Sequence, residues 1–432
     1  RSTPLYSSAA SDVYKRQVGR QALAANTTGS ANIAIGYKTL DANTTADNNT
    51  AIGHQSLGAN TTGEKNTATG AEALKANTTG SNNIGMGYDA LVANTTGTRN
   101  IAIGNGALDA PDTENDNIAI GYDALGGAID GGEYNVAIGN YSMDALTTGD
   151  KNTALGFNSL TGLTTGSWNT AVGHEAGKAM TTGADNTVLG LSAGLAITTG
   201  SRNIAIGGVA LDAADAENDN MGIGYAALGG AIDGGETNVA IGNYSMDALT
   251  TGDANTALGY QSLTGVTTGG YNVALGNNAL ATNTTASYNV ALGNQAMSAN
   301  TTGESNLAIG HVSLGSITTG NYNVGVGQSA LNGNTTGLRN TSLGYGALDA
   351  PDTENDNLAI GYEALGGSIA GGEYNAAVGN YALDALTSGD GNTGIGYNAM
   401  TELTTGSGNV SLGRASGTTI TTGSNNTVIG KG

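Results

Sequence analysis

Asn32-Ile-Ala-Ile-Gly36, followed by Tyr37-Lys-Thr-Leu-Asp-Ala-Asn-Thr-Thr45, is the stretch from which almost the whole chain is built. An Asn that opens a phrase of the form Asn-x-Ala-Φ-Gly (Φ apolar) occurs 24 times from Asn32 to Asn426, at 20 intervals of 17 residues and 3 of 18. A repeat this short and regular indicates one structural unit stacked on its neighbours, rather than two or three globular domains.

Counting each repeat from its Asn as position 0, the next positions have the pattern of a strand. Positions 1 and 3 are mostly aliphatic or β-branched, as in Ile33 and Val136, and position 2 is Ala, Gly or Ser in all but two repeats. The alternation predicts a strand with a bulky apolar face toward the core and a small-residue face that a second copy can approach. Position 4 is Gly in all 24 repeats, which indicates a positive φ or a space too tight for Cβ.

Position 8 carries Leu or Met in all but three of the 23 repeats that include it, and we interpret it as the core residue of a second short strand. The exceptions are Gly177, Gly194 and Gly417, and in these repeats position 11 is aliphatic. Position 11 is often Asn elsewhere, so we expect it to point either in or out. Two strands and two turns in 17 residues predict an all-β, parallel β-solenoid of about 24 rungs.

Stacking of such rungs places equivalent residues in register along the solenoid. Side-chain amides of stacked Asn residues can hydrogen-bond from rung to rung, which explains a fixed Asn without any chemistry. The structural ladder that we predict comprises Asn32, Asn49, Asn66, Asn83, Asn100, Gly36, Gly53, Gly70, Gly87 and Gly104.

Residues 1–17 do not follow the repeat. Lys15 stands where an Asn is due, and Ser11 to Gln17 resembles read-through of a sequencing adapter. We therefore expect a non-native or disordered leader over residues 1–17. Residues 18–432 are expected to form a single continuous solenoid, truncated at both ends because the last repeat is interrupted after Gly430.

Composition narrows the classes of function. A formal net charge of −21 argues against nucleic acid or an anionic membrane as a partner. The lack of Cys removes disulfides, thiolate catalysis and zinc-thiolate sites. No apolar run is long enough for membrane insertion of this segment. No Ser-His-Asp set, acidic pair or phosphate loop stands out, so we predict no enzyme, no catalytic residue and no cofactor.

The phrase Asn-[Ile/Thr/Val]-Ala-[Ile/Leu]-Gly followed by Ala-Leu-x-Ala resembles the head repeats of trimeric autotransporter adhesins, the YadA-like head family, over residues 18–432. It is also similar to repeats of phage tail-fibre-like proteins. The resemblance implies a left-handed β-roll packed side by side as a homotrimer, on the outer surface of a bacterial cell. The repeat here is longer than the family's usual coil, and its extra residues fall in the Asn-Thr-Thr-Gly turn.

We therefore expect a structural and adhesive segment of a bacterial surface fibre, which binds a surface protein or glycan through its long side. The alternative is a shaft or receptor-binding segment of a phage tail fibre, on the virion tail. A glycan-degrading spike would need an acidic pair that converges on a groove. A calcium-binding or ice-binding solenoid is a further alternative.

Acidic turns supply the candidate Ca²⁺ ligands, because carboxylate oxygens suit this ion. We favour solvated acidic turns that keep the chain soluble, because the nonapeptide of calcium β-rolls is absent. The candidates are Asp109, Asp112, Glu114, Asp116, Asp130 and Glu133.

Aromatic residues recur at the position before the Asn, position −1. Such rows can hold sugar rings or protein side chains, although aromatic ladders that stabilise the sheet are the interpretation that we favour. The candidates for ligand stacking are Tyr134, Trp168, Tyr271, Tyr288, Tyr322 and Tyr374.

Three further patterns have structural explanations. His54, His174 and His311 all occupy position 5, too many repeats apart to share a metal. The Asn-Thr-Thr sequences match the glycosylation pattern, but turn chemistry is the explanation that we favour. Adjacent Thr residues of a strand point to opposite faces, which argues against an ice-binding surface.

Overall fold

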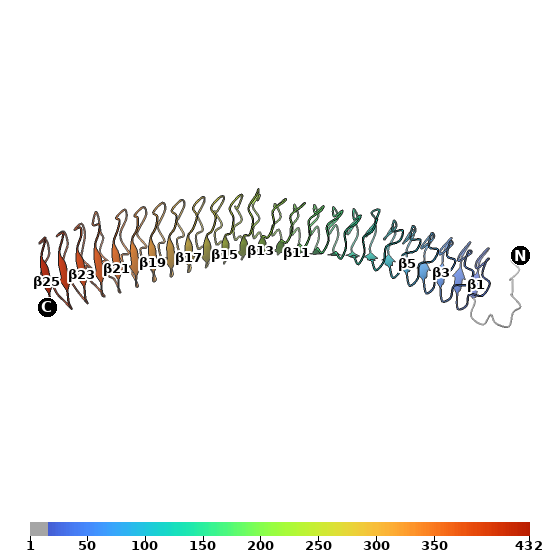
Figure 1. Cartoon of the computed structure of the whole chain (residues 1–432), viewed down its shortest axis with the longest axis horizontal. Helices are drawn as coiled ribbons and strands as arrows, with labels where there is room; N and C mark the ends of the chain where they lie inside the picture. The colour runs from blue at the N-terminus through green and yellow to red at the C-terminus, as the bar shows by residue number, and fades with distance from the viewer. Residues whose placement is uncertain (1–15) are drawn as a thin grey trace. The chain divides into compact units, whose positions relative to one another are not determined.

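The computed structural model describes residues 16–432 and is all-β. It contains 25 strands of three residues each, and each strand pairs in parallel with the equivalent strand of an adjacent coil. The predicted parallel β-solenoid of about 24 turns, with a period of about 17 residues, is confirmed. The coils form two compact units, which meet in sequence between Gly208 and Val209. Figure 1 shows the coils stacked along each unit.

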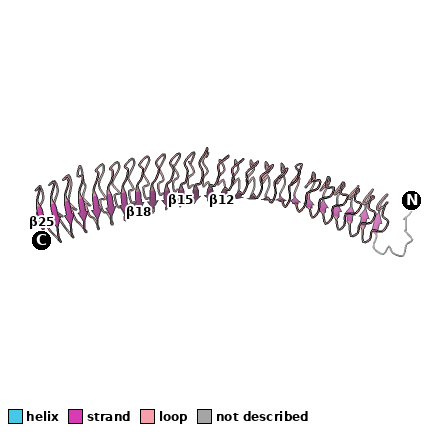
Figure 2. Ribbon diagram, viewed as in Figure 1, coloured by secondary structure: helices cyan, strands magenta, loops and turns pink. Residues whose placement is uncertain are grey.

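Each coil contributes one strand to a parallel ladder, and turns complete the rest of the coil (Figure 2). The strands of the first unit are β1 (Arg16–Val18), β2 (Ile33–Ile35), β3 (Thr50–Ile52), β4 (Thr67–Thr69), β5 (Ile84–Met86), β6 (Ile101–Ile103), β7 (Ile118–Ile120), β8 (Val136–Ile138), β9 (Thr153–Leu155), β10 (Thr170–Val172), β11 (Thr187–Leu189) and β12 (Ile204–Ile206).

The second unit repeats the same arrangement. Its strands are β13 (Met221–Ile223), β14 (Val239–Ile241), β15 (Thr256–Leu258), β16 (Val273–Leu275), β17 (Val290–Leu292), β18 (Leu307–Ile309), β19 (Val324–Val326), β20 (Thr341–Leu343), β21 (Leu358–Ile360), β22 (Ala376–Val378), β23 (Thr393–Ile395), β24 (Val410–Leu412) and β25 (Thr427–Ile429).

The register of the ladder keeps equivalent positions opposite one another. Across an 18-residue repeat, Ile118 still pairs with Val136, so the extra residue is absorbed in the turns. Arg16 pairs with Ile33, and the ladder therefore includes two residues that the sequence assigned to the leader. The rest of the predicted leader, residues 1–15, lies outside the described residues.

The orientation predicted for the strand is wrong. Ala34 at position 2 is fully buried, whereas Ile35 at position 3 is 40% exposed and Ile33 at position 1 is partly exposed. Space inside the coil is limited, because a Cβ added at Gly85, which occupies position 2, would lie 3.3 Å from Cγ of the buried Leu74. The small residues therefore line the core, and the bulky aliphatic residues form the outer face.

The predicted second strand is also absent. Leu40 and Leu57 at position 8 are fully buried, as expected of core residues, but each lies in a turn with φ of 50°. Position 11 points inward at Asn43 and Leu146, which are both fully buried, but outward in the three 18-residue repeats, where Ala128, Ala231 and Ser368 are exposed. The prediction that position 11 points either in or out is therefore confirmed. The core of a coil is thus one inward residue of the strand and inward residues of the turns.

The glycine exceptions at position 8 have a packing explanation. Gly177 and Gly194 share the left-handed backbone of the leucines that they replace, with φ of 60° and 58°. A Cβ added at Gly194 would lie 2.7 Å from Val188 Cγ1, and one at Gly177 would lie 3.3 Å from Val188 Cγ2. Val188, one of the two bulky residues at position 2, therefore fills the space that two leucines vacate.

The buried asparagines bind the coils together. The side-chain oxygen of Asn32 accepts a 2.9 Å hydrogen bond from the Asn49 N–H, and Asn49 Nδ2 donates to the Gly63 carbonyl at 2.8 Å. The same contacts continue through Asn66, Asn83 and Asn100. Each Asn thus satisfies buried backbone groups that the narrow coil would otherwise leave without partners.

The glycines at position 4 allow the coils to approach one another. Gly139 has a φ of 133°, and a Cβ added there would lie 2.3 Å from the Gly156 carbonyl oxygen. Gly36, Gly53 and Gly70 have the same geometry, with the carbonyl oxygen of the next coil 2.1–2.4 Å from the added atom. Only glycine fits this backbone and this space.

Candidate functional site

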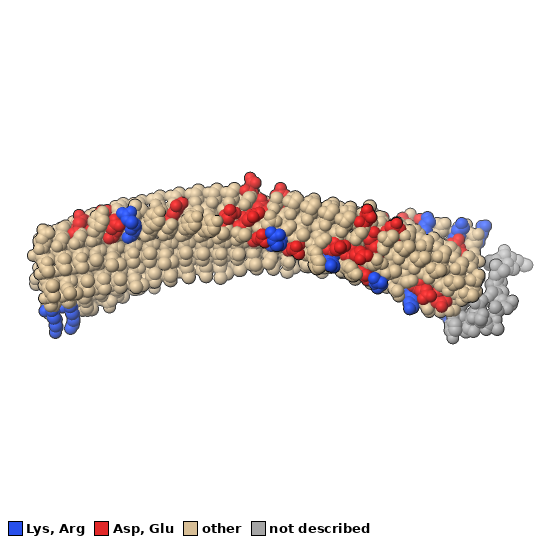
Figure 3. Space-filling model, viewed as in Figure 1, with Lys and Arg blue, Asp and Glu red and all other residues tan. Residues whose placement is uncertain are grey.

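An uncharged outer face runs along the strand ladder of each unit. Positions 1 and 3 of β2–β25 carry only Ile, Leu, Val, Met, Thr or Ala, and none of these side chains is charged. Ile52 and Leu258 are typical, with 38% and 46% of their surface exposed. Figure 3 shows a broad band free of charged side chains on the face in view, with Asp and Glu gathered elsewhere.

The predicted aromatic candidates lie at the surface beside the strands. Tyr271 and Tyr288 stack in adjacent coils, with ring centroids 5.3 Å apart and planes 5° apart. Trp168 lies under Lys151, whose Nζ is 4.1 Å from the ring centroid. All six candidates are more than half exposed and have a left-handed backbone; they are Tyr134, Trp168, Tyr271, Tyr288, Tyr322 and Tyr374.

A second set of aromatic rows runs along positions 5 and 6. The ring of Tyr141 meets those of Tyr122 and Phe157 edge to face, and Phe157 stacks on His174 at 5.3 Å. These rows are not among the site residues predicted from the sequence, although the recurrence of aromatic residues after the Gly at position 4 is visible there. Equivalent rows are Tyr225–Tyr244–Tyr260 and Tyr345–Tyr362–Tyr381–Tyr397.

Two of the three histidines, His54 and His174, stack on aromatic rings at the surface. His54 stacks on Tyr37 with ring centroids 5.6 Å apart, and the Arg20 guanidinium lies 5.9 Å from the Tyr37 centroid. His311 is exposed at the same position of a coil in the second unit. The structure therefore gives His54 and His174 neighbours for ring stacking, and no histidine of residues 16–432 belongs to a cluster that could hold a metal ion.

The acidic turns use their carboxylates to satisfy the backbone. Glu114 is buried, and its Oε2 accepts hydrogen bonds from the N–H groups of Asp112 and Thr113 at 2.8 and 3.0 Å. Its Oε1 accepts a third bond from the Gly131 N–H at 3.0 Å. Equivalent carboxylates are those of Glu217 and Glu354.

The other Ca²⁺ candidates are used separately. Asp116 pairs with Arg99 at 2.6 Å, which lowers the pKa of Asp116 chiefly through the hydrogen bond. Glu133 accepts a 2.7 Å bond from Asn115, and Asp130 is exposed. Between residues 16 and 432, no three His, Cys, Asp or Glu side chains are placed to hold a metal ion.

Asp109 lies in a row of carboxylates from neighbouring coils. Burial, and then the charge of Asp123, raises the pKa of Asp109 above its ordinary value of 3.8. Burial and the same Asp123 charge also raise the pKa of Asp144. The Oδ1 atom of Asp109 is buried without a hydrogen-bond partner, so the ionised row disfavours the fold at neutral pH.

The Asn-Thr-Thr turns hide the nitrogen that a glycan would occupy. Asn43 is fully buried, and its Nδ2 donates to Asn26 Oδ1 at 2.9 Å and to the Ala46 carbonyl at 3.2 Å. The adjacent Thr44 hydroxyl donates to the carbonyl of Thr61 in the next coil. These turns therefore form a second ladder inside the coil.

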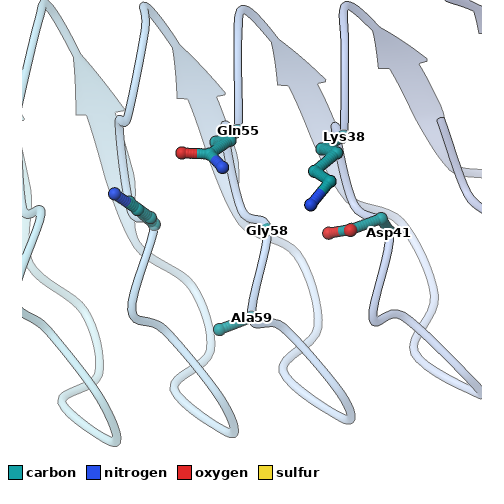
Figure 4. Close-up of a pocket in the computed structure, with 6 residues that line it drawn as sticks. Lys38, Asp41, Gln55, Gly58 and Ala59 are labelled. Carbon is teal, nitrogen blue, oxygen red and sulfur yellow. The ribbon is translucent and has the colours of Figure 1, made fainter. Parts of the chain in front are cut away.

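One shallow hollow opens on the first unit, with a volume of about 230 Å³. In Figure 4, Lys38 and Asp41 come from one coil and Gln55 from the next, and the hollow lies over Gly58, which has no side chain. Lys75 closes the hollow, but its ammonium already pairs with Glu72 at 3.0 Å. The mixed charges and open shape define no single ligand.

Comparison with known proteins adds no relative. No protein-family model matches the chain, and a search of curated proteins gives no match. Residues 16–432 also contain no helix that is long and apolar enough to cross a membrane.

Proposed function

We propose that the chain is a structural and adhesive segment of an extracellular bacterial fibre, similar to the head repeats of YadA-like trimeric adhesins. In this proposal three copies pack side by side through the outer face of the strand ladder. The turns and their aromatic rows stay exposed and contact a surface protein or glycan.

The observation that carries this proposal is the uncharged outer face of β2–β25. Two partly exposed side chains per coil leave on the order of 1,000 Å² of mostly apolar surface along each unit, above the ~300–600 Å² of the largest patch on a typical monomer. An area of this size suits a stable interface, which buries about 800 Å² per partner. The resemblance of the repeat supplies the number of copies and the left-handed coil.

A charge placed on this face tests the interface. Leu258→Glu puts a carboxylate on a side chain that is 46% exposed, so a lone chain tolerates it. In a side-by-side trimer three carboxylates would meet in an apolar contact, and we expect sedimentation to show dissociation into single chains. Thr251→Glu, on an exposed turn of the same unit, is the matched control and should leave the assembly intact.

The adhesive part of the proposal has its own test. Beads coated with the full chain should attach to surfaces covered with host matrix protein or glycan, and should detach when free chain is added. Equal attachment of uncoated beads would contradict an adhesive role and leave only a structural one.

A further inference from the structure

A gap interrupts the aromatic row of position −1 in the second unit. Tyr271 and Tyr288 stack in adjacent coils, the next coil carries Ser305, and the coil after that carries Tyr322. Tyr288 and Tyr322 are 59% and 62% exposed. The small Ser305 side chain therefore separates two exposed rings.

The backbone holds the residues of this gap in line. Tyr288, Ser305 and Tyr322 share a left-handed conformation, with φ of 63°, 58° and 61°. The Ser305 N–H donates to the Ser287 carbonyl at 3.2 Å, and the Tyr322 N–H donates to the Glu304 carbonyl at 3.1 Å. The three side chains leave the chain in the same way, and two coil rises of about 4.8 Å put the rings roughly 10 Å apart.

The first unit contains the same spacing with the gap filled. Tyr134, Lys151 and Trp168 occupy position −1 of three successive coils, with φ of 60°, 57° and 66°. The Lys151 ammonium lies 4.1 Å from the Trp168 ring centroid. A cation of the protein itself thus occupies the place that is left open over Ser305.

Distances and charge select the ligand of the open gap. A group at its midpoint lies roughly 5 Å from each ring, within the ~6 Å range of a cation–π contact but beyond the ~3.5–4.0 Å at which a flat ring touches both. A cation surrounded by methyl groups spans this distance. Glu304, exposed beside Ser305, adds a carboxylate in a chain of net charge −21.

We propose that the gap between Tyr288 and Tyr322 binds a methylated ammonium group, the chemistry shared by choline esters and methylated lysine. The site uses surface that the single chain exposes, and it does not depend on the number of copies in the fibre.

The test is a titration of the full chain with tetramethylammonium, followed by proton NMR of the probe. Methyl groups between two ring faces are shielded, so we expect their signal to move upfield and saturate. Ser305→Lys should weaken binding by about tenfold, because a tethered cation then fills the gap as Lys151 does. Lys is compatible with this backbone, since Lys65 and Lys151 occupy the same position with φ of 58° and 57°.

Tyr374→Ala is the matched control. Tyr374 is 62% exposed at the same position, but Asp356 and Gly391 occupy that position in the adjacent coils. Its loss should leave the titration unchanged. The proposal is overturned if the wild-type chain gives no saturable shift, if Ser305→Lys binds as tightly, or if Tyr374→Ala abolishes binding.

Two further arms refine the result. Lys151→Ser should open a second gap, and tetramethylammonium should then change the fluorescence of Trp168, the single Trp of the chain. An unchanged spectrum in this variant would contradict the role assigned to the two-coil spacing. Trimethyllysine should bind more tightly than phosphocholine, because Glu304 repels the phosphate; the reverse order would remove Glu304 from the site.

Discussion

Leu40, Leu57 and the equivalent leucines occupy a backbone conformation that residues with a Cβ normally avoid. Their φ values are near 50°, and a left-handed residue of this kind costs about 1–2 kcal/mol. Complete burial of a Leu side chain contributes about 1.5–3 kcal/mol, which offsets this cost. At position 8, burial of the leucine side chain thus compensates for the strain in its backbone.

Replacement of the glycine at position 4 is expected to destabilise the coil strongly. Gly139→Val should lower the free energy of unfolding by about 3 kcal/mol or more, because both φ and the neighbouring Gly156 carbonyl exclude a Cβ. Thermal unfolding by circular dichroism measures the loss. Gly391→Ala is the control, because a Cβ added at Gly391 would meet open space. Gly391 has a φ of 64°, and Ala254 adopts a similar φ of 55° at the equivalent position of another coil. Equal melting of wild type and Gly139→Val would refute this account.

The carboxylate row gives stability a defined dependence on pH. A raised pKa of Asp109 means that the folded state holds the proton more tightly than the unfolded chain. The contribution of Asp109 to the free energy of unfolding therefore increases as pH falls from neutral through the raised pKa toward 3.8. The same contribution is lost as pH rises through the raised pKa. Asp109→Asn should raise the melting temperature at pH 7 by roughly 1–2 °C and flatten the dependence.

Asp116→Asn is the control of opposite sign. Arg99 lowers the pKa of Asp116, so this carboxylate stabilises the fold above 3.8 and loses its effect in acid. The variant should not melt higher at pH 7. A higher melting point for Asp116→Asn, or a lower one for Asp109→Asn, would contradict the electrostatic assignment.

At the scale of the coil, the sequence predicted the period, the parallel ladder and one strand, but not which side of the strand faces inward. An alternation such as Ile33-Ala34-Ile35 normally buries its large residues, and only the narrow coil reverses that rule. The prediction of a second strand is wrong because Leu40 has a left-handed φ, which its residue type does not indicate. The sequence left open whether Asn43 points in or out, because the ladder partners that satisfy its buried amide lie in other coils.

The Val188 side chain fills space that a Leu at position 194 would otherwise occupy, and this makes the packing of a coil testable. Val188→Ala alone should cost about 2 kcal/mol, because it leaves a cavity where two leucines are missing. Gly194→Leu alone should also destabilise, because its Cβ meets Val188 at 2.7 Å. The double variant restores the usual Ala and Leu, so we expect a favourable coupling of about 1–2 kcal/mol in chemical denaturation. Simple additivity would contradict the shared space.

At the scale of the whole molecule, the surface of each unit divides into an uncharged strand face and turns with aromatic and charged rows. The sequence located the position −1 aromatics, because their recurrence is visible in the repeat. It could not locate the gap over Ser305, which depends on side chains two coils apart standing in line. It also assigned the approach of a second copy to the Ala face, which is buried in the coil.

The measurement that tests the central claim most directly is the solution mass of the full chain by light scattering. Burial of the outer strand face between copies predicts a particle of three chains, each of 42.5 kDa. A particle of a single chain, at concentrations where its β-rich circular dichroism spectrum shows it to be folded, would contradict the claim.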